Sequence, residues 1–290
     1  MNELNCGKKT LDLTHPAVMG IVNITPDSFS DGGALYSAGQ LDQSKTLAAV
    51  EAMLEAGADI IDIGGESTRP GADPVTCDQE LERVVPIVEA VTSRFDTIVS
   101  VDTSTPQVIE QVAAAGAHLI NDVRALQREG ALAAAVSCGL PVCLMHMQNQ
   151  PKSMQQNPQY QDVVTEVFDF LQQRKQVCVE AGISEDQILL DPGFGFGKTL
   201  THNLELFSGL DSLVKMGHPI LVGVSRKSMI GQILDSTVEE RLIGSVTMAL
   251  LAAQTVSAAQ GSLILRVHDV KETVQALRLW QRTQNFENDK

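Results

Sequence analysis

Short apolar runs recur along the chain, and most of them end in polar or charged residues. Eight runs stand out, at residues 18–23, 60–64, 98–102, 119–122, 142–146, 188–191, 220–224 and 263–266. Helix-like stretches separate them, and strands that alternate with helices form parallel sheets through βαβ units. Eight such units that close on themselves make a (β/α)8 TIM barrel, an α/β fold whose active site lies where the strands end. The pattern therefore predicts this barrel, with its chemistry at the carboxyl ends of the strands.

The segments between the runs carry helix signals. Asp42 can cap a helix that Gly57 ends, and a stripe of Leu and Val predicts a helix over 81–91. Pro86 either kinks that second helix or marks its first turn. The segment 6–13 is expected to form a small hairpin across the barrel bottom. Further helices are expected over 105–115, 129–138, 161–181, 201–216, 238–260 and 269–283.

Composition narrows the class of protein. A hydrophobic fraction of 43% is ample for a large core, and no linker-like segment divides the chain, so one domain over 1–290 is expected, with its core over about 11–283. The net charge of −15 opposes nucleic acid or an anionic membrane as a partner. The five cysteines lack metal-site spacing, and no secretory signal begins the chain, which together favour reduced thiols in a cytoplasmic protein. Polar residues interrupt the apolar stretch 242–265, which is expected to hold a buried helix and the last strand.

Two connections are too long and too rich in glycine and proline to be simple links. They follow the first two runs, over residues 25–40 and 64–76. Long loops in compact domains are usually functional or disordered. Phe29 in the first loop and Arg69 in the second suggest loops that close over a ligand, because such a loop needs an apolar side chain to cover the ligand and a charged one to hold it.

Cationic side chains follow strands that a barrel places close together. Arg69 lies in the second loop, Arg226 and Lys227 follow the seventh run, and Arg266 and His268 close the eighth. In a protein this acidic, such a group predicts a site for a phosphate or pyrophosphate. The alternative is ordinary ion pairing at helix N-termini.

Three acceptor-rich side chains end the third, fourth and sixth runs. Asp102, Asn121 and Asp191 share their strand faces with small or apolar neighbours, and that face should point into the barrel. Buried carboxylates need donors, and the planar, N–H-rich edge of a guanidine-like heterocycle would supply them. The alternative is that the two aspartates only cap the turns that follow them.

Other residues near the strand ends complete the predicted site. The motif over 193–199 lacks the first glycine of a P-loop, so its glycines are expected to let Phe196 approach a flat ligand, with Met145 across the pocket or in the plain core. His146 has no partner at catalytic or metal-binding spacing, which favours a structural histidine. Asn23 could hold Mg²⁺ together with substrate oxygens and water.

These residues belong to a longer series of motifs. Residues 23–33 (Asn-Ile-Thr-Pro-Asp-Ser-Phe-Ser-Asp-Gly-Gly) and 62–71 (Asp-Ile-Gly-Gly-Glu-Ser-Thr-Arg-Pro-Gly) resemble the two signature stretches of bacterial dihydropteroate synthases. Shorter matches follow in order at 101–103, 120–122, 144–147, 190–198, 225–228 and 266–269. The resemblance extends from about residue 11 to about residue 279.

The resemblance implies an enzyme that joins 6-hydroxymethyl-7,8-dihydropterin diphosphate to 4-aminobenzoate, giving 7,8-dihydropteroate and pyrophosphate in folate biosynthesis. It further implies Mg²⁺ at Asn23, inhibition by sulfonamides and a homodimer. The implied catalytic residues are Asp102, Asp191, Lys227, Arg266 and His268. The implied substrate contacts are these five together with Pro26, Phe29, Thr68, Arg69, Pro70, Asn121, Met145, Phe196, Gly223 and Ser228.

The implied reaction needs no enzymic nucleophile if the C–O bond to diphosphate breaks first. Asp102 and Asp191 would then stabilise a cation on the pterin methylene, while Arg69, Arg266 and His268 stabilise the departing anion. Two rivals remain open: a pterin-binding methyltransferase domain, and a non-catalytic pterin-binding protein that derives from the enzyme.

Overall fold

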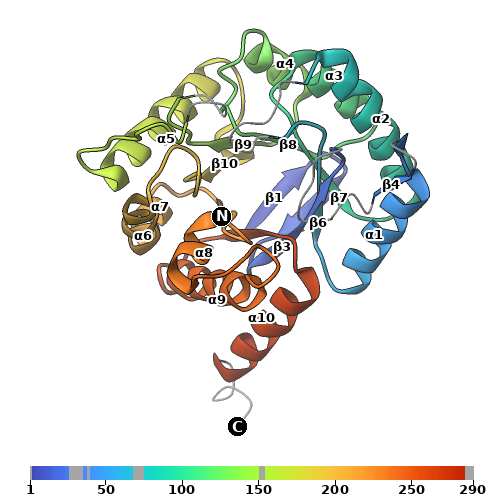
Figure 1. Cartoon of the computed structure of the whole chain (residues 1–290). Helices are drawn as coiled ribbons and strands as arrows, with labels where there is room; N and C mark the ends of the chain where they lie inside the picture. The colour runs from blue at the N-terminus through green and yellow to red at the C-terminus, as the bar shows by residue number, and fades with distance from the viewer. Residues whose placement is uncertain (1, 26–34, 38–39, 68–74, 150–153, 285–290) are drawn as a thin grey trace.

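The architecture is a closed barrel of parallel strands inside a ring of helices (Figure 1). The computed structural model describes residues 2–25, 35–37, 40–67, 75–149 and 154–284. Around the barrel the strands follow the order β10-β11-β12-β3-β6-β7-β8-β9. The predicted (β/α)8 fold class is therefore confirmed, and each predicted apolar run overlaps one barrel strand. Their bounds are β3 (Ala17–Asn23), β6 (Ile60–Gly64), β7 (Ile98–Asp102), β8 (Leu119–Asp122), β9 (Val142–Met145), β10 (Ile188–Asp191), β11 (Ile220–Val222) and β12 (Leu263–Val267).

The helices connect successive strands on the outside of the barrel (Figure 1). They are α1 (Gln43–Glu55), α2 (Cys77–Arg94), α3 (Pro106–Ala114), α4 (Ala131–Cys138), α5 (Val163–Glu180), α6 (Leu200–Ser208), α7 (Leu210–Val214), α8 (Ser228–Leu234), α9 (Leu242–Ala258) and α10 (Val270–Gln284). A short 3-10 helix, η1 (Glu185–Gln187), precedes β10, and a two-residue ladder pairs β4 (Tyr36–Ser37) with β5 (Gln40–Leu41).

Local sequence explains where several helices begin. Asp42 caps α1 as predicted, since its carboxylate accepts from the N–H groups of Ser44 and Lys45. Thr76 caps α2 in a capping box with Gln79, so Pro86 lies inside the helix and does not mark its first turn.

Two helix predictions need correction. The single helix expected over 201–216 is two helices that meet at Gly209. A Cβ on Gly209 would lie 3.0 Å from both γ-carbons of Val164, so α5 packs directly against the backbone at the break. Helix α8 was not predicted, because it has only seven residues and no side-chain N-cap to mark its start.

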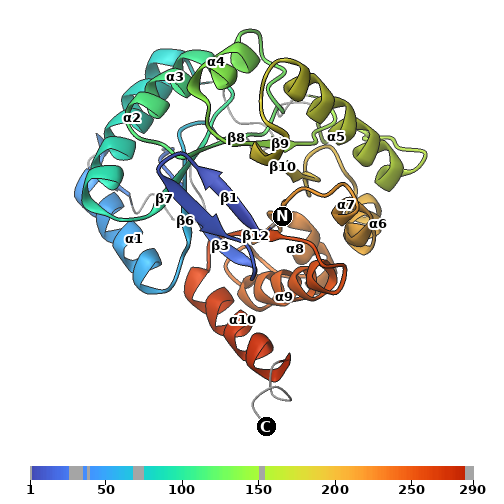
Figure 2. The same cartoon turned by 180° about the vertical axis from the view of Figure 1, so that it is seen from behind.

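The predicted N-terminal hairpin is present and closes the bottom of the barrel. Its strands are β1 (Glu3–Cys6) and β2 (Lys9–Asp12), which pair antiparallel. Figure 2 shows them lying across the barrel opening. Leu4, Cys6 and Leu11 join one buried apolar cluster with barrel residues such as Met19 and Ile264.

Each barrel strand has two faces with different roles. Outward residues, for example Ile61 and Ile63 on β6, pack under the helices in the large core. Inward residues near the strand starts are apolar and contact the hairpin. Toward the carboxyl ends of the strands the inward positions become polar, and the candidate site lies there. No helix in the described ranges is long and apolar enough to cross a membrane.

Candidate active site

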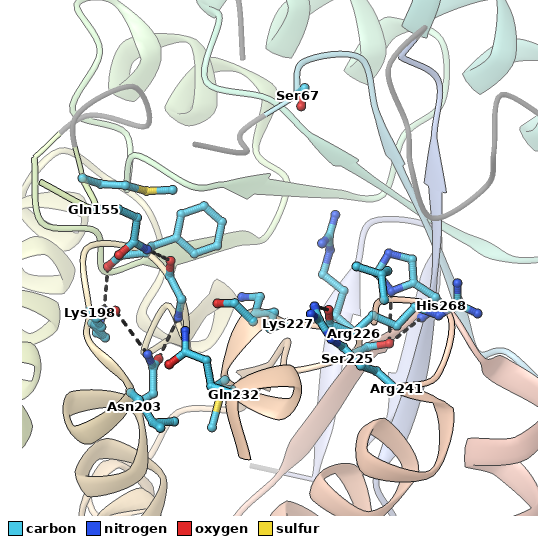
Figure 3. A pocket seen from close by; sticks show the side chains of 18 of the residues that line it. Ser67, Gln155, Lys198, Asn203, Ser225, Arg226, Lys227, Gln232, Arg241 and His268 are labelled. Carbon is cyan, nitrogen blue, oxygen red and sulfur yellow. Dashed lines mark hydrogen bonds between the residues drawn. The ribbon is translucent and has the colours of Figure 1, made fainter. Parts of the chain in front are cut away.

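A cavity of about 760 Å³ opens at the carboxyl ends of the strands, as predicted. Figure 3 shows its walls, with Lys198, Gln155 and Asn203 on one side and Ser225 and His268 on the other, and Lys227 between them. Seven predicted site residues line it: Asn23, Asp102, Phe196, Lys227, Ser228, Arg266 and His268.

The floor of the cavity is an arginine between two carboxylates. Arg266 on β12 donates from Nε to Asp62 Oδ2 at 2.6 Å and from Nη2 to Asp102 Oδ2 at 3.1 Å. Asp62 is fully buried in β6, and also accepts from Ser100 Oγ at 2.6 Å and Asn121 Nδ2 at 3.4 Å. Burial disfavours the charged guanidinium, but the negative charges of Asp62 and Asp102 outweigh this effect and raise the pKa of Arg266.

Asp62 was missed by the sequence analysis, although a signal was present. It stands two residues after Ile60 on the inward face of the strand, as Asp102 stands two after Ser100. It precedes the strand end by two residues, so attention to strand ends alone passed over it.

Three predicted ligands of the heterocycle lie at or next to the carboxyl ends of their strands. Register pairs Asp102 with Asn121 and Asp191 with Met145. Asn121, Asp191 and Met145 are each at most 6% exposed and, like Gly223, do not line the cavity formed by the described residues. The charges of Lys227 and Arg266 act on Asp191.

Burial perturbs the charged groups of this layer. Desolvation raises the pKa of Asp102 to about 8, since it outweighs the opposing charge of Arg266 while Asp62 adds like charge. Desolvation also raises the pKa of Asp191 and lowers that of Lys227 to about 8. Asp191 accepts from the N–H of Gly193 at 2.7 Å, so it caps the turn that follows it, as the alternative in the sequence analysis expected. The charge of Lys227 also acts on this carboxylate. Titratable groups with shifted pKa values in a cleft are typical of a functional site.

The described members of the predicted cation group converge on the cavity. Lys227 lies with Nζ 4.6 Å from the Phe196 ring centroid and donates to the Phe194 carbonyl. Nδ1 of His268 lies 3.0 Å from Ser225 Oγ, which also accepts from the backbone N–H of His268 at 3.2 Å.

Arg226 also lines the cavity, but it has a partner within the protein. Its guanidinium forms hydrogen bonds to Asp269 at 3.0 and 2.5 Å. Its part in an anion site stays a prediction.

Five predicted contacts lie outside the described residues: Pro26, Phe29, Thr68, Arg69 and Pro70. Glu66, at the base of the second loop, forms an ion pair with Arg124 at 2.9 Å. Arg124 also donates to Ser104 Oγ at 3.0 Å, which ties this loop to the segment after β7.

Asn23 meets the donor requirements of a magnesium site that depends on substrate. A Cβ on Gly64 would lie 3.7 Å from Asn23 Oδ1 and 3.9 Å from Asp102 Oδ2, so two oxygens border the same space beside the cavity. No cluster of three or more His, Cys, Asp or Glu suited to a metal occurs among the described residues. Since Mg²⁺ is commonly bound through one or two protein oxygens plus phosphate and water, this donor set fits.

Comparisons with known proteins agree with this site. Residues 19–268 match the family model of pterin binding enzymes. The dihydropteroate synthase of Haemophilus influenzae is 53% identical over 283 residues, which cover 98% of this chain and 99% of that protein.

Two solved structures are also similar. The Yersinia pestis dihydropteroate synthase in complex with a sulfonamide drug has a TM-score of 0.92 and 53% identity, and the match covers 98% of this chain and 99% of that one. The Xanthomonas albilineans dihydropteroate synthase in complex with 7,8-dihydropteroate has a TM-score of 0.84 and 43% identity, with 97% and 98% covered. The chain described here therefore belongs to the dihydropteroate synthase family of pterin-binding enzymes.

Proposed function

We propose that this protein is a transferase that joins 6-hydroxymethyl-7,8-dihydropterin diphosphate to 4-aminobenzoate and releases pyrophosphate and 7,8-dihydropteroate. The observation that carries the proposal is the group of Asp102, Asn121 and Asp191 at the strand ends, beside a cavity that Asp102 lines together with Lys227, Arg266 and His268. The acceptor side chains suit a flat, N–H-rich ring, the cationic side chains suit a diphosphate, and the two groups lie next to each other.

Recognition of the pterin follows from donor and acceptor types. Carboxylates only accept hydrogen bonds, and a carboxamide both donates and accepts. Asp191 and Asn121 therefore suit the amino and ring N–H groups of the pterin, and Lys227 suits its carbonyl oxygen. Asp191 and Asn121 are buried and Lys227 is partly buried, so little water competes for their hydrogen bonds to the ligand, which favours tight binding.

Bond breaking is assisted by charge, with no enzymic nucleophile. The C–O bond to diphosphate breaks, the electron pair leaves with the phosphate oxygen, and the methylene cation is delocalised over the pterin ring. The carboxyl oxygens of Asp102 and Asp191 stabilise that cation, while Arg266 and His268 stabilise the departing anion. The arylamine nitrogen then forms the C–N bond and loses a proton to water.

Asn23 is the residue we propose for Mg²⁺, through its side-chain oxygen. When bound, the ion would neutralise charge on the leaving diphosphate. Phe196 and Ser228 border the cavity beside Lys227 and would contact the aminobenzoate ring. The sulfonamide complex of the Yersinia pestis relative supports sulfonamides as inhibitors at that place.

We also propose a cytoplasmic homodimer with one domain per chain. The described surface of α9 and α10 exposes Ile243 at 77% and Leu279 at 71%, as a dimer face would. All five cysteines are free thiols, as a reducing compartment requires.

A coupled assay for pyrophosphate tests the proposal. The expected result is pyrophosphate release that depends on both the pterin diphosphate and 4-aminobenzoate, with 7,8-dihydropteroate formed in equal amount. Binding of the pterin without pyrophosphate release would contradict the proposal and favour a non-catalytic binding protein. Methyl transfer from a methylated folate would favour the methyltransferase rival.

A further inference from the structure

The glycine-rich loop over residues 193–198 is held in an unusual way. After β10 the chain makes a tight excursion in which Gly193, Gly195 and Gly197 all have positive φ. A Cβ on Gly193 would lie 1.8 Å from the His146 carbonyl oxygen, and one on Gly197 would lie 2.7 Å from that of Gln148. The loop thus lies directly against the segment after β9, with no room for side chains at these positions.

Successive carbonyl groups of this loop accept hydrogen bonds from side chains. Gly193 and Phe196 accept from Lys198 Nζ at 2.9 and 3.1 Å. The other side chains that donate to loop carbonyls are Lys227 to Phe194, Gln155 to Gly195, Tyr160 to Gly197 and Asn203 to Lys198. Four side chains from outside the loop, together with Lys198, therefore define its conformation.

Lys198 holds both ends of the turn that carries Phe196. Besides the two carbonyls, its Nζ lies 2.9 Å from Nδ1 of His146. The His146 carbonyl oxygen lies 3.5 Å from Nζ as well, so four acceptors surround an ammonium that has three N–H donors. Lys198 is 3% exposed, so each unmade bond would leave a buried group unsatisfied.

His146 fits the role of a neutral acceptor. It is 6% exposed, and burial together with the charge of Lys198 lowers its pKa to about 2. Since Nδ1 accepts, the proton of the neutral ring lies on Nε2. The ring packs edge-on against Phe170, with centroids 4.9 Å apart, and the backbone N–H of His146 donates to the Asp191 carbonyl.

We propose that Lys198, fixed by neutral His146, is a positioning residue that sets Phe196 for the arylamine substrate. This proposal rests on the proposed function, because it assigns a task within the same site. Lys198 does not act as a phosphate-binding lysine, despite its place after a glycine-rich motif.

The effect should fall on the arylamine more than on the pterin. Phe194 is fully buried and packs against Phe207, so the first half of the loop is anchored without Lys198. Lys227 lies on a separate segment of the chain, where the charge of Asp191 acts on it. Phe196 is only partly buried, and its backbone is held by its own N–H, which donates to the Gly193 carbonyl, and by the bond from Lys198 to its carbonyl. Lys198 donates to both of these carbonyls, so its loss should loosen Phe196.

The test compares Lys198→Met with the exposed control Lys215→Met, whose side chain is 72% exposed. We expect Lys198→Met to raise the KM for 4-aminobenzoate by about tenfold or more, the cost of one or two buried hydrogen bonds to a charged donor. The Kd of the pterin diphosphate should change by less than about threefold, because Lys198 acts on Asp191 only through its charge. Amide hydrogen exchange at residues 194–197 should accelerate by about tenfold or more.

His146 supplies a second, conservative pair of variants. His146→Asn places an acceptor oxygen near the position of Nδ1, so its KM for 4-aminobenzoate should stay close to that of the unaltered protein. His146→Leu removes the acceptor and should reproduce part of the Lys198→Met effect. These variants also cover the case in which Lys198→Met fails to fold.

Distinct outcomes separate this proposal from the proposed function. Equal changes in both substrate constants, unchanged amide exchange in Lys198→Met, or identical behaviour of His146→Asn and His146→Leu would overturn it. Absence of turnover in the unaltered protein would contradict the proposed function, whereas amide exchange would still test the control of the loop by Lys198.

Discussion

The two ends of the barrel interior differ in chemistry, although the same strands build both. Near the hairpin the inward residues are apolar, as with Ile60 on β6 and Ile264 on β12. Two residues further along the same faces stand Asp62 and Arg266, which form a buried ion pair at 2.6 Å. The step from one layer to the next changes a hydrocarbon core into a charged one.

This contrast separates stability from function. The apolar end stabilises the barrel through close packing and buries no charge. The polar end removes charged groups from water, and a buried ion pair seldom returns its full desolvation cost. We infer that the charged layer is retained for the ligand, and that the protein would be at least as stable without it.

The largest effect should follow from breaking the ion pair on one side. Asp62→Leu leaves Arg266 buried with one carboxylate, and we expect a loss of about 3–5 kcal/mol in the free energy of unfolding. The double variant Asp62→Leu/Arg266→Met extends the apolar layer upward and should recover most of that loss. Denaturant unfolding measures both.

Activity should not recover with stability. The double variant lacks the cation proposed for the diphosphate, so pyrophosphate release should remain at least about a hundredfold slower than in the unaltered protein. A double variant as unstable as Asp62→Leu alone would contradict the distinction between the two layers.

The pH dependence of stability should come from the polar end. Folded Asp102, with its pKa near 8, keeps a proton that the unfolded chain releases near pH 4. Between these values the folded state binds more protons, so the free energy of unfolding falls as pH rises. Asp102→Asn should flatten this dependence between pH 5 and 8, while the exposed change Asp211→Asn should leave it unaltered. Equal slopes in all three proteins would reject this assignment.

The smallest effect should come from a conservative change at the apolar end. Ile60→Val removes one buried methylene, and we expect a loss of about 1 kcal/mol in the free energy of unfolding. Turnover of the folded variant should stay within about twofold, because the residue contributes only packing. A clear rise in either KM would show that the two layers are coupled.

Sequence predicted the fold well because its signals are local. Apolar runs mark each barrel strand, and the cap at Asp42 marks the start of α1. The break at Gly209 escaped prediction because it depends on packing against Val164, a residue distant in sequence.

The site was predictable in part, for the same reason. The two-residue period placed Asp102, Asn121 and Asp191 on the inward face, where they lie. Asp62 and Lys198 were missed because their roles come from contacts across the barrel mouth, with Arg266 and with His146. The roles of the site residues, and the single-domain organisation over 1–290, stay predictions.

The most direct measurement is calorimetric titration of the pterin diphosphate into Asp191→Asn beside Ile60→Val. If the polar layer binds the pterin, Asp191→Asn should weaken binding by about tenfold or more, as expected for a lost hydrogen bond to a charged group. Ile60→Val should bind like the unaltered protein. Affinity of a folded Asp191→Asn within twofold of the unaltered protein would contradict the account.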